Sequence, residues 1–521
     1  MRIARHVLVV AVVAASFSIA VSEDTAQQTY VLDPTQRPDG SSEDLDFLLH
    51  GSMSSEFVPD RVLRALVAAN PDLFPGGDLS AFGVIEPGLD EAPIGLTTRT
   101  VDYLGGQHSW GINCMSCHSG TVEMPDGPPL VVLGMAGNFN VEAFYGAVLG
   151  ATFRAGSKDG IGPFLTAYAR VYYPKSSPTA LEESIAKGRE AIDKLLADDP
   201  YGAKGIAAGE LHEIRPEELE PGTDAPRLAQ ALLRLFHNMR VALHVPEPPP
   251  APTATPGGPG RNDAFGLLGA ALLGKAPAVS APVKFAHPWN LEGRAWVHWD
   301  GNTSDPTVRN VLAALGLGCP SDRQGSRLDM KLISRHTELS ERLRSPKYPF
   351  AVDEDAAKRG ADLYQTHCAS CHESADDKRL YTPEEVGTDP NRARLVDQDY
   401  VAGFGAWLGG LKIEGFTPKE GSVRPTGKYF AAWLDDAWAR APYLHNGSVR
   451  TMRELLTKAA DRPKTWRRGA RAYDQEAMGF QDGGSFDFDT SLPGNSNSGH
   501  EYGADLSDAE KRELIEYLKT R

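Results

Sequence analysis

The stretches "NCMSCHSG" (113–120) and "HCASCHES" (367–374) each contain the pattern Cys-x-x-Cys-His. The chain has 521 residues and five cysteines, four of which lie in these motifs: Cys114, Cys117, Cys368 and Cys371. A chain of this length does not need disulfide bonds to stabilise its core, and zinc would not require a histidine after each pair. Covalent haem requires both features, because two thiols attach the porphyrin and the adjacent histidine binds the iron. The motifs therefore predict two covalent haem c groups, with His118 and His372 as proximal ligands.

The N-terminus has the parts of a secretory signal peptide. A basic segment, "MRIARH", precedes the apolar run "VLVVAVVAASFSIAV", and the small residues "AVS" end at Ser22. The run is short for a bilayer span, so cleavage that removes residues 1–22 is favoured over a membrane anchor. The sequence thus predicts a periplasmic or secreted protein with no membrane span after cleavage. Its net charge of −16 argues against nucleic acid as a partner.

Helical patterns surround the second motif. In "DEDAAKRGADLYQTHCASCH" the apolar residues repeat at helical spacing, and the C-terminal "LSDAEKRELIEYLKTR" has a capping box at Ser507 and Glu510 followed by an apolar stripe. This arrangement resembles class I cytochrome c and predicts a C-terminal cytochrome c domain over residues 345–521. Residues 23–344 would form an N-terminal haem c domain, enlarged by long loops and extra helices, with a Pro-rich loop at 246–260. The predicted fold is mainly α, with two c-type cytochrome domains.

The sixth iron position decides what each haem can do, because a second strong ligand gives an electron-transfer centre and an open position admits peroxide or dioxygen. For the second haem, His500 lies in the loop "PGNSNSGHEYG" and is the preferred distal ligand. His445 in "APYLHNGSV" is the next candidate and Met478 the third. The helical spacing around Met452 favours a core position for that side chain.

The region of the first haem contains "PWNLEGRAWVHWDGNTSDPTVRN" (288–310), with three tryptophans and two arginines. Two interpretations remain open. The segment is either a tryptophan-rich packing cluster or the wall between the haems and above the first iron.

Several stretches together resemble a known family. "GPGRNDAF", "HWDGNT", "APYLHNGSV" and "PGNSNSGHEYG" are similar to motifs of the bacterial di-haem cytochrome c peroxidase superfamily, and most similar to its rubber oxygenase-like branch. The resemblance implies that Trp299 passes electrons between the haems, that His500 completes the second haem, and that His445 is not an iron ligand. The family also has an interdomain calcium, for which the sequence offers no clear ligand set.

The chain departs from the family near the first haem. The position of the catalytic glutamate of the peroxidases corresponds to Cys319, which otherwise suits a small buried side chain. Two phenylalanines of the rubber oxygenase pocket correspond to His298 and Ala314. His298 would serve as a distal base, bind the first iron, or form a hydrogen bond near a propionate. Arg309 is a second distal candidate, with propionate pairing as its alternative.

Two functions follow from these predictions. The first is an exported di-haem oxidoreductase that transfers electrons between its haems and reacts with peroxide or dioxygen at the first. The alternative is a non-catalytic electron-transfer protein in which both irons are six-coordinate. The predicted partners are a redox protein or a small-molecule oxidant.

Overall fold

The computed structural model describes residues 30–36, 41–86, 92–172, 178–198, 209–220, 223–245, 255–274, 279–322, 325–375 and 378–521. The predicted signal peptide and residues 246–254 of the Pro-rich segment lie outside these residues. Within them, no helix is long and apolar enough to cross a membrane.

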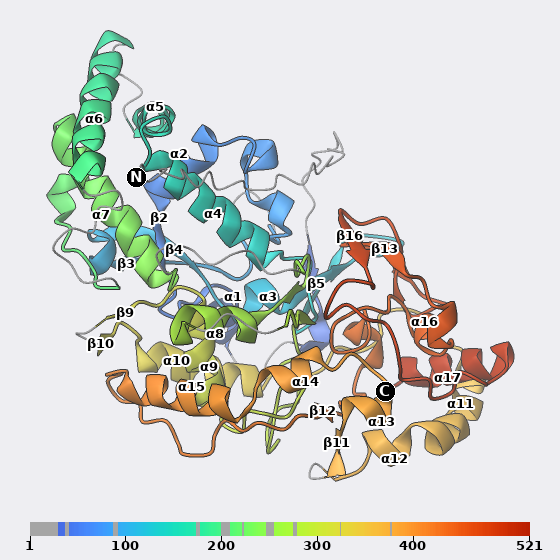
Figure 1. Ribbon diagram of the computed structural model, residues 1–521. Helices are drawn as coiled ribbons and strands as arrows, with labels where there is room; N and C mark the ends of the chain where they lie inside the picture. Colours follow the sequence, from blue (N-terminus) through green and yellow to red (C-terminus); the bar gives the residue numbers. More distant parts are fainter. Residues whose placement is uncertain are drawn as a thin grey trace, which may run out of the picture.

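The helices are distributed along the whole chain (Figure 1). Those before residue 345 are α1 (Ser42–His50), α2 (Asp60–Ala69), α3 (Cys114–Cys117), α4 (Val141–Ala155), α5 (Ile161–Tyr172), α6 (Pro178–Asp198), α7 (Ala225–Ala242), α8 (Ala264–Leu273), α9 (Pro306–Gly316) and α10 (Met330–Glu341). Those after it are α11 (Glu354–His367), α12 (Ala369–His372), α13 (Pro383–Val386), α14 (Asn391–Leu395), α15 (Gln398–Gly410), α16 (Met452–Leu455) and α17 (Asp508–Lys519).

The strands form small sheets. One three-stranded sheet has the order β1 (Val31–Leu32), β6 (Leu130–Leu133), β5 (Ser119–Val122), and another has the order β2 (Val58–Pro59), β4 (Gln107–Ile112), β3 (Leu96–Val101). The two-stranded pairs are β7 (Arg261–Asn262) with β8 (Val283–Lys284), β9 (Ser321–Asp322) with β10 (Gly325–Ser326), β11 (Leu380–Tyr381) with β12 (Tyr429–Phe430), β13 (Thr465–Arg468) with β16 (Phe486–Asp489), and β14 (Tyr473–Asp474) with β15 (Gly479–Phe480).

The prediction of a mainly α protein built from two cytochrome c domains is wrong. Of the described residues, 44% are helical and 13% lie in strands, which form several small sheets. The first Cys-x-x-Cys-His motif follows strand β4 and precedes strand β5, whereas the second follows helix α11. Strands of two to six residues are too short to produce a clear apolar alternation. The sequence-based prediction therefore recognised the longer helical patterns and missed the strands.

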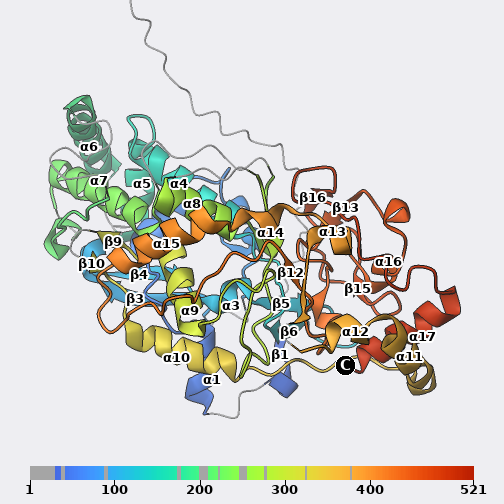
Figure 2. The same cartoon turned by 60° about the horizontal axis from the view of Figure 1, so that its bottom comes forward.

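The second motif lies in the predicted helical setting. Asp353 caps α11, and the capping box of Ser507 and Glu510 begins α17 as expected. The two helices pack closely at Gly360, where a Cβ atom would lie 2.0 Å from the backbone oxygen of Glu513. Figure 2 shows α11, α12 and α17 side by side, far from α5, α6 and α7.

The interior contains a hydrophobic core that crosses the predicted boundary between residues 344 and 345. From the N-terminal side it includes Leu48, Met115 and Val131, and from the C-terminal side Trp438 and Leu514. The predicted domain limits remain a proposal, but this interior is continuous across them.

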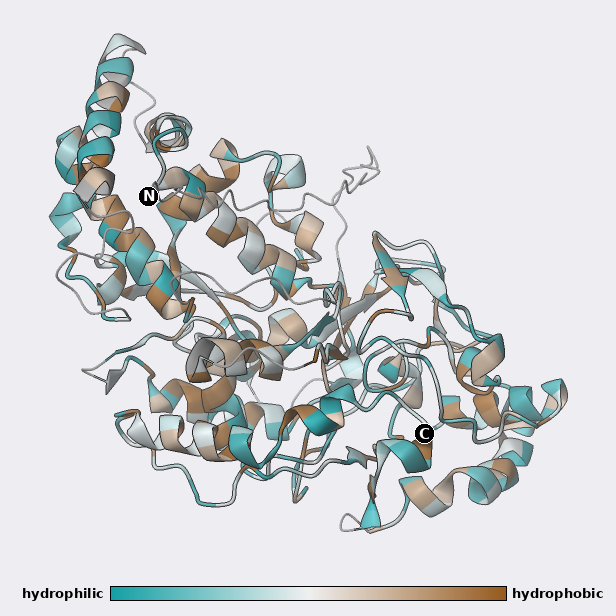
Figure 3. Ribbon diagram, in the orientation of Figure 1, coloured by the Kyte–Doolittle hydropathy of each residue, from teal (hydrophilic) through white to brown (hydrophobic). Residues whose placement is uncertain are grey.

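Figure 3 shows a mainly hydrophobic helix α8 at the centre and a helix α6 of mixed character at the outside.

Candidate haem sites

The first Cys-x-x-Cys-His motif forms the short helix α3 and the residue after it. Asn113 begins this turn: its side-chain oxygen accepts a hydrogen bond from the Met115 amide, and its Nδ2 donates to the backbone oxygens of Leu48 and Gly51. Cys114 is half-buried and Cys117 is buried, and both are free thiols. The turn therefore places two cysteines and the adjacent histidine within five residues, the arrangement that haem c attachment requires.

His118 follows as a half-buried residue whose ring lies 5.7 Å from the ring of Phe285, measured between centroids. Burial, and next the nearby charge of Arg309, lower its pKa to about 4. A neutral imidazole is the form that binds iron, so His118 suits the predicted proximal role.

The second motif fixes its histidine more tightly. The Nδ1 atom of His372 donates a hydrogen bond of 2.6 Å to the backbone oxygen of Ala432. This leaves Nε2 with a free lone pair, as in most metal-bound histidines, whose second nitrogen donates to a carbonyl or carboxylate. Arg379 donates to the backbone oxygen of His372 and so stabilises the same turn.

His500 lies opposite His372. Their ring centroids are 6.3 Å apart. Two imidazoles on opposite sides of one metal should have centroids about 6 Å apart, because a metal–nitrogen bond is about 2 Å long and the nitrogen lies about 1 Å from the centroid. The backbone supports this position, since the His500 amide donates to Val386 and Arg462 donates to the His500 carbonyl. The pair therefore fits the dimensions of a bis-histidine haem.

The other candidates for the second iron are occupied differently. His445 is buried, stacks on Tyr429 with centroids 4.2 Å apart, and has its Nε2 3.0 Å from the Tyr429 hydroxyl. That hydroxyl donates to the backbone oxygen of Asp389, so the His445 Nε2–H is the donor to it. Met452 and Met478 both lie in the hydrophobic core.

His298 and Arg309 lie near the first motif. Burial lowers the pKa of His298 to about 3, and the charges of Arg309 and His118 contribute. The charge of Arg309 also affects the pKa values of Cys114 and His118. The structure therefore groups these predicted site residues, although the sequence separates them by nearly 200 positions.

The tautomer of His298 follows from its neighbours. Its Nδ1 lies 2.9 Å from the side-chain oxygen of Asn302, which also accepts a hydrogen bond from the Thr303 hydroxyl. That oxygen is an acceptor in both contacts, so Nδ1 carries the proton and Nε2 has the lone pair. His298 can therefore act as a base or bind a metal through Nε2.

Trp299 connects the surroundings of the two motifs. Its Nε1 donates a 2.9 Å hydrogen bond to the backbone oxygen of Lys284, the residue before Phe285. Its own backbone oxygen accepts a 2.8 Å hydrogen bond from the amide of Phe430, two residues before Ala432. One tryptophan thus lies between the residue that contacts His118 and the segment that bonds to His372.

A buried ion pair positions this tryptophan. Asp300, the next residue, pairs with Arg392 of helix α14 at 3.0 Å, and both side chains are buried. Sequence patterns missed Arg392, Lys284, Asn302 and Ala432, because each acts through a partner that is distant in sequence or through its backbone. The acidic residue of "HWDGNT" was the only signal for this ion pair.

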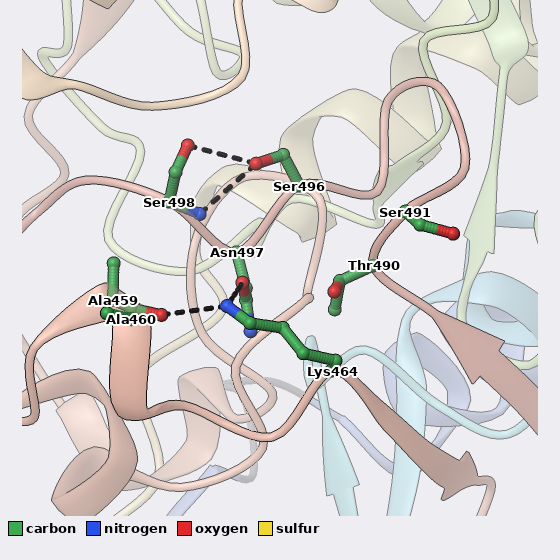
Figure 4. A pocket seen from close by; sticks show the side chains of 8 residues that line it. All are labelled: Ala459, Ala460, Lys464, Thr490, Ser491, Ser496, Asn497 and Ser498. Atoms are coloured by element: carbon green, nitrogen blue, oxygen red, sulfur yellow. Dashed lines mark hydrogen bonds between the residues drawn. The ribbon is translucent and has the colours of Figure 1, made fainter.

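Three further features of the structure concern metal and ligand binding. Cys319 is fully buried, as expected for a small core side chain. Among the described residues, no group of three or more histidine, cysteine and acidic side chains could hold a metal ion, so calcium stays a prediction. A surface pocket of about 400 Å³ lies beside the loop that precedes His500, and Lys464 lines it (Figure 4). None of the predicted site residues lines this pocket.

Comparisons with known proteins identify a cytochrome segment. Residues 427–467 match a family described as RoxA-like, cytochrome c-like. This segment contains Tyr429, Ala432 and His445, and a cytochrome c-like domain implies covalent haem c. The segment therefore supports haem-based electron transfer or a haem oxidoreductase role.

Two curated proteins of Sinorhizobium fredii (strain NBRC 101917 / NGR234) are similar over longer stretches. The uncharacterized protein y4iJ is 30% identical over 550 aligned positions, which cover 85% of this chain and 80% of y4iJ. The uncharacterized protein y4iM is 32% identical over 279 positions, covering 45% of this chain and 63% of y4iM.

Proposed function

This chain belongs to the family that includes the uncharacterized protein y4iJ, and we propose that it is an exported di-haem c-type oxidoreductase. Cys114 and Cys117 attach the first haem and Cys368 and Cys371 the second. Bound haem supplies one-electron chemistry and, where an iron position is open, reactivity toward peroxide or dioxygen.

The observation that carries the proposal is the continuous connection through Trp299. The path leads from His118 to Phe285 by ring contact, and from the Lys284 carbonyl to Trp299 by a hydrogen bond. From Trp299 it continues by a hydrogen bond to Phe430 and then along the chain to Ala432, the partner of His372. Such a path favours electron exchange between the two sites over two independent haems.

The residues at the two sites suit them to different roles. His372 and His500 would hold the second haem, and two histidine ligands would favour electron storage over ligand binding. At the first site, the unprotonated Nε2 of His298 is available to accept a proton from an oxidant, and Arg309 provides a nearby positive charge. A redox protein or a small-molecule oxidant is the proposed partner.

The same histidine favours a second candidate function. The Nδ1–Asn302 hydrogen bond of His298 resembles the Nδ1–Ala432 hydrogen bond of His372, and both leave Nε2 free. If His298 binds the first iron, both irons are six-coordinate and the protein is a non-catalytic electron carrier.

The spin state of the first haem separates the two functions. The full-length protein, produced with haem maturation machinery, should contain covalent haem on a haem-stained gel. In the oxidoreductase, electron paramagnetic resonance shows one high-spin centre that changes with cyanide or peroxide. Two low-spin centres that respond to neither reagent would assign the carrier function instead.

A further inference from the structure

Four cationic side chains lie together between the two candidate haem sites, and three of them are buried. Arg261 and Lys284 are directly paired across strands β7 and β8. Arg468 and Arg440 lie close enough to Lys284 for their charges to lower its pKa, together with burial. The exposed fractions are 0% for Arg261, 1% for Lys284 and 3% for Arg468, and Arg440 is half-buried. These four residues are called the cation cluster below.

Burial lowers the pKa of Arg261 and nearby carboxylates partly offset this effect, whereas no carboxylate offsets the burial of Lys284 or Arg468. Among the described residues, Lys284 and Arg468 form no ion pair with any acidic side chain. Lys284 Nζ donates to the backbone oxygen of Arg440, and Arg468 donates to the backbone oxygens of Pro259 and Gly447. Backbone oxygens satisfy hydrogen bonds, but they do not neutralise a buried charge, which costs several kcal/mol when it has no counter-charge.

Arg261 points to a missing acceptor. Its Nη2 donates to the side-chain oxygen of Asn495, but its buried Nε and Nη1 atoms have no hydrogen-bond partner in the described part of the chain. Buried guanidinium nitrogens without a partner are rare and require an explanation. An anionic oxygen within reach of Nε or Nη1 would accept a hydrogen bond from a donor that the protein leaves unsatisfied.

The position of the cation cluster suggests the source of that anion. Lys284 precedes Phe285, whose ring contacts His118, and the Lys284 Nζ lies 5.2 Å from the ring centroid of Trp299. Each haem c brings two propionate carboxylates to the protein, and these are the acids that enter the interior with the cofactor.

We propose that the cation cluster binds haem propionate, with Lys284 and Arg468 supplying the positive charge and Arg261 the unsatisfied donors. This inference rests on the proposed function, since it requires haem at the two motifs. Residues outside both Cys-x-x-Cys-His motifs would thus neutralise the negative charge of the haem propionates.

Two substitutions in the holoprotein test the proposal: Lys284→Met and Arg468→Met. Each removes a charge but keeps a long apolar side chain. The matched control is Arg467→Met, because Arg467 is the exposed neighbour of Arg468 on strand β13. The measurements are the propionate bending bands in resonance Raman spectra and the midpoint potentials of the haems.

The expected result is a shift of a propionate band and a lower midpoint potential for one haem in both buried variants, because a nearby cation favours the reduced, less positive haem. Arg467→Met should match the unmodified protein. Arg468→Lys, which retains the charge, should fold even if Arg468→Met does not, and should retain most of the potential.

Unchanged bands and potentials in both methionine variants, with full haem content, would overturn the inference and leave the proposed function intact.

The thermal stability of the holoprotein gives an independent test. A buried cation without an anionic partner can be replaced by a hydrophobic residue with a neutral or stabilising effect, so a higher melting temperature of Lys284→Met holoprotein would also overturn it. Absence of covalent haem from the unmodified protein would remove the proposed function as well.

Discussion

Three histidines of the candidate sites differ in the ring nitrogen that is already engaged. His372 and His298 use Nδ1, for a backbone oxygen and for Asn302 respectively, and keep Nε2 free. His445 uses Nε2 for the hydroxyl of Tyr429. The hydrogen bond that one ring nitrogen already makes determines whether the other nitrogen can bind iron or accept a proton. For these three histidines this matters more than the position in a sequence motif.

Substitution of His298 tests its role as a base. In the His298→Ala protein, the reaction with peroxide should slow by about 10²–10⁴-fold, the range expected when a positioned acid or base is removed. Stopped-flow absorbance of the holoprotein measures this rate, and the spectrum of the second haem should stay the same. An unchanged rate and an unchanged spectrum of the first haem would dismiss His298 from both proposed roles.

His336 of helix α10 makes stability depend on pH. Burial lowers its pKa to about 4, and its Nε2 contacts the Gly51 carbonyl at 3.0 Å. An unfolded histidine has a pKa of about 6.5, so below that pH the unfolded chain binds a proton that the folded chain excludes. The stability contributed by neutral His336 is therefore lost as the pH falls from about 6.5 to 4, by about 1.4 kcal/mol per pH unit.

His336→Gln keeps a donor for Gly51 but cannot titrate. Urea unfolding of this variant between pH 7 and 5 should show a shallower loss of stability than the unmodified protein. His108→Gln, at an exposed position, is the control. Parallel curves for the His336→Gln and unmodified proteins would contradict the assignment.

At the scale of elements, the sequence predicted what depends on local pattern. The apolar stripe of α17, its capping box and the helix before the second motif were all predicted correctly, because each is determined within about fifteen residues. The small sheets were missed: β12 and β7 have two residues each and depend on distant partners. Contacts between residues that are distant in sequence are harder still to predict. Trp299 and Phe430, for example, meet only in the folded chain.

The contact between α11 and α17 predicts a specific sensitivity at Gly360. In Gly360→Ala a methyl group would lie 2.0 Å from the Glu513 oxygen, so the helices must separate, at a cost of about 1–3 kcal/mol. Gly405, in helix α15, is the matched control, since a Cβ atom there meets nothing within 4 Å. Gly405→Ala should stabilise the protein by about 0.5–1 kcal/mol, because alanine favours a helix interior. Chemical denaturation measures both effects, and equal effects would refute the steric argument.

At the scale of the whole molecule, the two Cys-x-x-Cys-His motifs lie in different settings that share contacts through the segment 283–310. Phe285, the residue after strand β8, contacts His118 at the first site, and the Trp299 backbone oxygen bonds to Phe430 of β12 beside the second. Trp299→Phe removes the indole hydrogen bond to Lys284, and therefore should slow electron exchange between the haems. Flash reduction followed by absorbance at both haems measures this exchange.

Trp296→Phe is the control, because Trp296 packs against Arg424 and forms no part of the path. Both variants should have the haem spectra of the unmodified protein. Exchange that is as fast in Trp299→Phe as in Trp296→Phe would exclude the proposed route.

The hydrophobic core that contains both Met115, next to Cys114, and Leu514 of helix α17 has a consequence for biogenesis. This core is therefore complete only after the segment with Leu514 has been synthesised. If haem attaches at Cys114 and Cys117 as proposed, we expect these thiols to be more accessible before that core is complete than afterwards. A fragment cut near residue 344 would expose this interior to water and would aggregate rather than mature as a miniature cytochrome.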